Sequence, residues 1–212
     1  MTSGPTDPIY DPVLEKMIVK PSHIKARAYG YSLANSIIDA FHAGDFVPSS
    51  KSSITVRSSE IELGIENFML SLGTLLGIID TDLKFSLFPP FMRYLSEVAF
   101  IQLGDASIVG IPGELYPEIA VGGIENPEGA DYVITPQEVP NLRSQFPEKL
   151  NLMVNLANDA IGYIIPKSEW DEDPPWIYGE TEETYGEIVS LGPNTAPKIH
   201  EKIIKLIDES KK

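Results

Sequence analysis

Hydrophobic residues recur every three or four positions in two stretches of the chain. Between Ser22 and Gly44 this spacing predicts a helix that Ser22 caps and Gly44 ends. From about Pro197 the apolar residues share one face of a second helix, and lysines and acids occupy the other face. The second pattern is typical of an amphipathic helix.

Alternation of apolar and polar residues predicts strands in the middle of the chain. Residues 97–104 and 106–111 alternate on either side of the turn dipeptide Gly104-Asp105, which predicts a hairpin. Residues 54–56, 61–63 and 152–156 read as further strands, whereas the apolar run 65–79 fits a helix or a buried strand equally well.

Two stretches rich in proline, glycine and polar residues interrupt this pattern. Residues 1–22 are expected to be irregular, and residues 122–150 to form an inserted loop with little packed structure. Strands followed by helices predict an α/β fold with a mixed β-sheet and flanking helices. We expect a single domain that spans residues 1–212.

The charge of the chain excludes some classes of partner. With 31 acidic and 16 basic residues the net charge is −15, which repels nucleic acid and anionic lipid headgroups. Eight carboxylates and no basic residue lie between Glu169 and Glu187. We interpret this segment as a solvated acidic loop, with a cation site as the alternative, although its spacing fits no calcium-loop motif.

The chain has no cysteine, which excludes disulfides and thiolate metal sites. No signal peptide and no apolar run of membrane-spanning length is visible in the sequence. The expectation is a soluble cytoplasmic protein.

Two residues are candidates for chemistry. Glu114 follows a Pro-Gly turn at the end of an apolar strand, and Tyr163 lies just past a second strand. Ligand sites in α/β sheets collect at such strand ends, so the two side chains meet if the strands are neighbours. The alternative is that Glu114 interacts with the dipole of the following helix and Tyr163 packs at the surface.

Three segments resemble the neutral/alkaline, non-lysosomal ceramidase family. Residues 97–115 resemble its strand–turn–strand segment that ends in Pro-Gly-Glu. Residues 156–166 are similar to its Asn-x-Tyr-x-x-Tyr segment, with Ala160 in place of the first tyrosine. Residues 190–195 resemble its Ser-x-x-x-Gly-Pro-His-Thr element, with Asn194 in place of the histidine.

This resemblance implies a zinc-dependent amide hydrolase that acts on an N-acyl amide or lipid-type substrate. In the family two histidines, the glutamate of Pro-Gly-Glu and the last tyrosine of the second segment hold one zinc ion. Carried over to this chain, Glu114 and Tyr163 become candidate metal ligands, and zinc is the implied cofactor. The catalytic residues stay unknown, because the family's serine has no counterpart here.

The sequence departs from the family at its histidine ligands. The opening Met1–Pro5 matches only the tail of the family's His-Thr-His-Ser-Gly-Pro motif, with Thr2 at the second histidine. His23 and His42 flank the first predicted helix, and His200 is expected on a solvated face. A shortened enzyme, or one whose histidines come from a partner chain, is one hypothesis. A non-catalytic relative that binds a small molecule or lipid, and a structural or interaction protein, are the alternatives.

Overall fold

The computed structural model describes residues 7–44, 50, 53–79, 81–148, 150–182 and 184–211. Contacts divide the chain into two compact units, residues 1–49 and 50–212. The second unit contains the mixed sheet and the helices that flank it, so the predicted α/β class is confirmed. No helix in these described ranges is long and apolar enough to cross a membrane.

The first unit consists of a hairpin and one long helix. Strands β1 (Ile9–Asp11) and β2 (Lys16–Ile18) pair antiparallel, and α1 (His23–Ala43) follows them. The predicted caps of this helix are confirmed, since Ser22 accepts a hydrogen bond from the Lys25 amide and Gly44 adopts a left-handed conformation with φ 79°.

The expectation that residues 1–22 are irregular was wrong for this hairpin. The carboxylate of Asp11 accepts hydrogen bonds from the amides of Val13 and Leu14, which fixes the turn between the two strands. It also forms a 2.8 Å ion pair with Arg27 of α1. A buried aspartate with three partners therefore orders a segment that its proline content marked as irregular.

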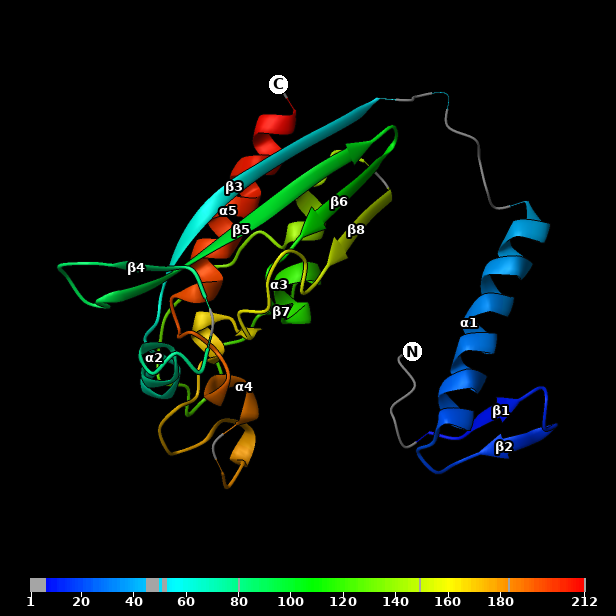
Figure 1. Ribbon diagram of the computed structural model, residues 1–212, viewed down its shortest axis with the longest axis horizontal. Helices are drawn as coiled ribbons and strands as arrows, with labels where there is room; N and C mark the ends of the chain where they lie inside the picture. The colour runs from blue at the N-terminus through cyan, green and yellow to red at the C-terminus, as the bar shows by residue number, and fades with distance from the viewer. Residues whose placement is uncertain are drawn as a thin grey trace. The chain divides into compact units, whose positions relative to one another are not determined.

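The second unit is built on a sheet with strand order β3-β5-β6-β8 (Figure 1). The pairs β3/β5 and β5/β6 are antiparallel and β6/β8 is parallel, while the short β4 also pairs with β5. The hairpin predicted around Gly104-Asp105 is confirmed, and the two short strands expected at 54–56 and 61–63 form one continuous strand. The bounds are β3 (Ile54–Gly64), β4 (Leu83–Phe85), β5 (Met92–Leu103), β6 (Ala106–Gly110) and β8 (Leu150–Val154).

Helix α5 (Thr195–Ser210) packs against one face of β3 and β5 (Figure 1). Its apolar stripe meets the inward side chains of the strands and forms the core, as the amphipathic pattern predicts. The run 65–79, which the sequence left open, contains helix α2 (Phe68–Leu75), capped by Asn67. Fully buried side chains in the core include Leu63, Val98, Phe100, Val109, Ile199, Ile203 and Ile207.

The segment 122–150 has little regular structure, as predicted, and three of its described residues are buried: Ala130, Glu138 and Leu142. Its described residues contain one 3-10 helix, η1 (Leu142–Gln145), before β8 begins. Leu142 and Glu138 are nevertheless fully buried, and Glu138 accepts a hydrogen bond from the Lys167 amide. The remaining short elements are β7 (Glu114–Leu115), α3 (Pro117–Val121), β9 (Tyr163–Ile164), η2 (Lys167–Glu169), η3 (Ile177–Gly179) and α4 (Tyr185–Ile188).

Candidate functional site

Glu114 and Tyr163 lie opposite each other in a two-stranded parallel sheet. β7 follows the carboxyl end of β6, β9 follows β8, and β7 and β9 pair with Glu114 in register with Tyr163. The Glu114 amide donates to the Gly162 carbonyl at 2.9 Å, and the Tyr116 amide donates to the Ile164 carbonyl at 3.1 Å. The structure thus brings together the two residues that the sequence singled out, at the strand ends where it expected them.

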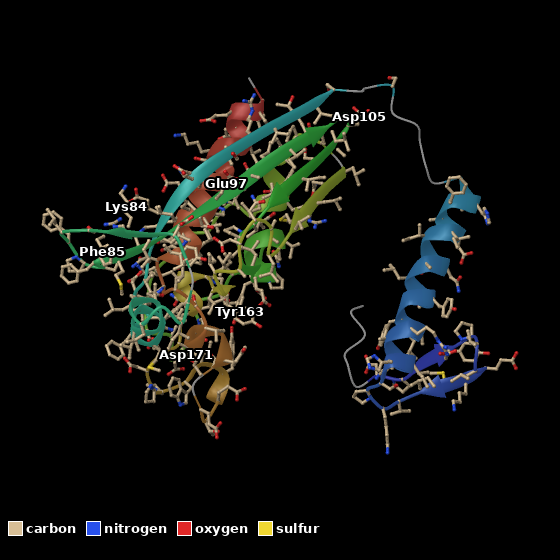
Figure 2. The ribbon with its side chains drawn as sticks, viewed as in Figure 1. Lys84, Phe85, Glu97, Asp105, Tyr163 and Asp171 are labelled. Atoms are coloured by element: carbon tan, nitrogen blue, oxygen red, sulfur yellow. The ribbon has the colours of Figure 1, made fainter. Side chains whose placement is uncertain are left out.

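The two side chains are close enough to interact electrostatically. The negative charge of the Glu114 carboxylate raises the pKa of the Tyr163 phenol above its usual value of 10. The phenol therefore keeps its proton at neutral pH. Figure 2 labels Tyr163 in the larger unit.

Two further tyrosines stand against the Tyr163 ring. The rings of Tyr116 and Tyr185 meet it edge-on, with centroids 6.2 and 6.0 Å away. Burial raises the pKa of Tyr116 to about 12, so this phenol is also neutral. Sequence reasoning missed both, although Tyr116 follows Glu114 by two residues, the spacing that puts side chains on one face of an extended segment.

Two glycines allow close packing around β9, Gly113 against residue 162 and Gly162 against residue 189. A side chain at Gly113 would place its Cβ 2.5 Å from the Gly162 carbonyl oxygen, and one at Gly162 would place it 1.8 Å from the Val189 carbonyl oxygen. The Ser190 hydroxyl donates to the Tyr163 carbonyl at 2.8 Å. The backbone around Tyr163 therefore packs closely against residue 113 and against residues 189–190.

An acidic cavity of about 520 Å³ is lined in part by Tyr116, whose ring meets that of Tyr163. Glu169 and Glu187, which line it, are buried, and burial raises the pKa of both carboxyls, to about 7 for Glu187. Asp171, which Figure 2 labels, is also fully buried. The interpretation of residues 169–187 as a solvated loop was therefore wrong for these three acids. The lining residues are Tyr116, Glu118, Glu169, Ile177, Tyr178, Glu180, Glu182, Thr184 and Glu187.

The histidines do not join the Glu114–Tyr163 pair in any contact that the described residues make. His200, expected on a solvated face, is buried, and its Nε2 lies 2.8 Å from the Pro140 carbonyl oxygen. The loop that precedes η1 covers this side of α5, which the helical pattern alone could not reveal. His23 and His42 belong to the first unit.

Comparisons with family models, with curated proteins and with solved structures found no match for this chain. The assignment of chemistry to the site therefore depends on the residues themselves.

The donor chemistry of the Glu114–Tyr163 pair fits zinc in part. A carboxylate and a phenolate are oxygen ligands of the kind that zinc accepts, and the two residues lie in register on neighbouring strands. A zinc site takes three or four protein ligands, so this pair fills two positions. Across the part of the chain that the structure describes, no group of three or more His, Cys, Asp or Glu residues is arranged to hold a metal ion.

Proposed function

We propose that this chain carries part of a zinc-dependent amide hydrolase, in which Glu114 and Tyr163 are two of the metal ligands and a partner chain supplies the histidines. The observation that carries the proposal is the Glu114–Tyr163 pair, in register across two parallel strands and close enough for the carboxylate charge to raise the pKa of the phenol. The substrate class is an N-acyl amide or lipid-type amide, as the ceramidase resemblance implies.

The contacts among three distant segments support the proposal. The segments that resemble the ceramidase family, around residues 114, 163 and 190, pack against one another: Glu114 pairs with Tyr163, and the Ser190 hydroxyl binds the Tyr163 carbonyl. A resemblance spread over the sequence in three pieces thus converges on one place in the fold. Such convergence is expected if the pieces form one site.

The residues of the pair have defined tasks in this proposal. Glu114 provides a negative charge that attracts a cation, and Tyr163 must give up its phenolic proton to become a ligand. Tyr116 and Tyr185 restrict the position of the Tyr163 ring from two sides. A bound zinc ion supplies Lewis-acid chemistry, polarising an amide carbonyl and activating a water molecule for attack.

Replacing either residue of the pair is expected to weaken zinc binding. We expect Glu114→Ala and Tyr163→Phe each to raise the zinc dissociation constant at least tenfold, since each removes one donor atom. Zinc affinity is measured by competition with a chromophoric chelator at pH 7. Glu118→Ala is the matched control, because it removes the same charge four residues away and should change the constant less than about twofold. Equal affinities in all four proteins would contradict the proposal.

A second candidate function is binding of a small apolar or lipid-like molecule without turnover. A pocket of about 240 Å³, mostly apolar, borders the residues just before Tyr163. Its apolar lining is of the kind that binds small ligands, and its volume is a little below the roughly 300–1,000 Å³ of typical sites, which suits a small ligand or one part of a longer one. The lining residues are Ile65, Leu70, Thr74, Ile79, Tyr94, Ala160, Ile161, Gly162, Val189 and Leu191.

A substitution in the pocket tests this second function. Leu70→Asp is expected to weaken binding of a fluorescent fatty acid at least tenfold, because it puts a charge into an apolar cavity. Leu75→Asp changes an exposed residue of the same helix that does not line the pocket, and should leave the affinity unchanged. Failure of the wild-type protein to bind the probe would exclude this candidate for fatty-acid ligands.

A further inference from the structure

The acidic cavity next to Tyr116 has no basic side chain in its described lining. Its volume of about 520 Å³ is that of a small-molecule site. The carboxyl groups that line it come from four separate parts of the fold, so the tertiary structure brings these charges together. They are Glu118 of α3, Glu169 of η2, Glu187 of α4, and Glu180 and Glu182 of the segment between η3 and α4.

Two of these carboxyl groups have an oxygen that lacks a hydrogen-bond partner. Glu169 is only 8 % exposed; one of its oxygens accepts the 2.6 Å hydrogen bond from the Glu125 amide, and no described residue donates to the other. In Glu118, Oε2 is buried and has no partner within the described part of the chain. Burying a carboxylate is costly unless a positive charge or donors satisfy it. These oxygens therefore point to a ligand that brings positive charge and N–H donors.

Glu187 gives the same indication from the far end of the acidic segment. It is 4 % exposed, and its carboxylate accepts a hydrogen bond from the Thr184 hydroxyl. Burial raises the pKa of Glu187 to about 7, and the negative charges of Asp171 and Asp131 contribute to the increase. A buried acid behaves in this way when no positive charge lies nearby.

The spacing of the acids favours an organic cation over a metal ion. Among the described residues no group of three or more His, Cys, Asp or Glu is arranged to hold a metal, so these carboxylates do not converge on one small ion. A flexible chain with several ammonium groups can meet carboxylates that stand apart. The rings of Tyr116 and Tyr178 form part of the wall, and aromatic rings attract ammonium ions that lie over their faces.

We propose that this cavity binds a small aliphatic polyamine, whose ammonium groups pair with the carboxylates of Glu118, Glu169 and Glu187. Each primary ammonium group brings three N–H donors to oxygens that lack them. Lysine side chains of a protein present the same chemistry, but a free polyamine has no peptide backbone to accommodate. The inference does not depend on the zinc proposal, because neither Glu114 nor Tyr163 lines the cavity.

Calorimetric titration of the full-length protein with spermidine at pH 8 tests the inference. We expect one spermidine to bind per chain, and Glu169→Gln to raise its dissociation constant at least tenfold, since a charge-assisted contact is lost. Glutamine keeps an acceptor for the Glu125 amide. Asp173→Asn is the matched control, because it removes the same charge from an exposed residue of the acidic segment that does not line the cavity. Its dissociation constant should change less than about twofold.

Two competitors distinguish this site from a general attraction to the acidic chain. The net charge of −15 draws any cation towards the protein, so Mg²⁺ should weaken spermidine binding no more than NaCl of the same ionic strength. The peptide trilysine should bind more weakly than spermidine, because its backbone must also be accommodated. Circular dichroism checks that the variants stay folded.

The inference is wrong if the folded wild-type protein does not bind spermidine. It is also wrong if Glu169→Gln and Asp173→Asn weaken binding equally, which would indicate attraction to the overall charge. Tighter binding of trilysine than of spermidine would assign the cavity to a basic peptide instead. Zinc affinity should be the same in Glu169→Gln as in the wild type, so a failure of either proposal can be told from a failure of the other.

Discussion

Replacing Gly162 by alanine is expected to lower the free energy of unfolding by roughly 3–5 kcal/mol. Gly162 has φ +90°, where an L side chain is strained, and an added Cβ would lie 1.8 Å from the Val189 carbonyl oxygen. Because that oxygen belongs to the backbone, the segment around residue 189 must move. Urea unfolding followed by circular dichroism measures the loss.

Gly123 provides the control for this substitution. It also has a positive φ, of +104°, but an added Cβ there meets nothing within 4 Å. Gly123→Ala should therefore cost only the backbone strain, about 1 kcal/mol. If Gly162→Ala costs no more than Gly123→Ala, the close packing of β9 against residue 189 is wrong, and with it the positioning of Tyr163.

The second large expected effect is a decrease in the free energy of unfolding as the pH rises from about 4.5 to 7. Burial raises the pKa of Glu187 to about 7 in the folded protein, against 4.5 in the unfolded chain. Between these values the folded state binds a proton that the unfolded state has released, so the stability is full below pH 4.5 and falls as the pH approaches 7. The contribution of Glu187 is on the order of 3 kcal/mol. Glu169 and Asp171, whose pKa values burial also raises, act in the same direction.

Glu187→Gln is expected to flatten this pH dependence, since glutamine does not titrate. Urea unfolding at pH 4.5, 5.5, 6.5 and 7.5 gives the slope for each protein. Glu182→Gln, at an exposed position in the same acidic segment, should keep the wild-type slope. An unchanged slope in Glu187→Gln would mean that Glu187 is ionised and solvated in the folded protein.

The elements that the sequence predicted well are those with local signals. Ser22 caps α1 with its side chain, which accepts from the Lys25 amide, Gly44 ends the helix in a left-handed conformation, and Gly104-Asp105 specifies the β5–β6 turn. The run 65–79 stayed open because its glycines and apolar residues suit either a helix or a buried strand. Its outcome depends on Asn67, whose side chain caps α2 by accepting from the Leu70 amide.

The errors concern burial that arises from contacts between distant segments. Glu169 is buried because its carboxylate accepts a 2.6 Å hydrogen bond from the Glu125 amide, 44 residues earlier in the chain. His200 is buried because its ring nitrogen lies beside the Pro140 carbonyl. The pattern of apolar and polar residues within either segment does not indicate which distant residue will contact it. From the sequence alone, the carboxylates of residues 169–187 and the histidine at position 200, which lies between two lysines, were therefore predicted to face solvent.

The sequence predicted the two residues of the candidate site, but it did not predict that they would meet. The sequence placed Glu114 and Tyr163 at strand ends, but their meeting required the two strands to be neighbours, which strand patterns do not specify. The parallel pairing of β7 with β9 satisfies that condition. Tyr185 could not have been found, because it reaches the Tyr163 ring from a segment 22 positions away that no local pattern connects to it.

The most direct test of the central claim is the number of protons released when zinc binds. At pH 7 the Tyr163 phenol holds its proton, since the ordinary pKa of a phenol is about 10 and the Glu114 charge raises it further. If Tyr163 is a zinc ligand, binding must displace this proton. Calorimetric zinc titrations in buffers of different ionisation enthalpy should give about one proton more for the wild-type protein than for Tyr163→Phe. Equal proton release by the two proteins would mean that zinc, if it binds, does not use this tyrosine.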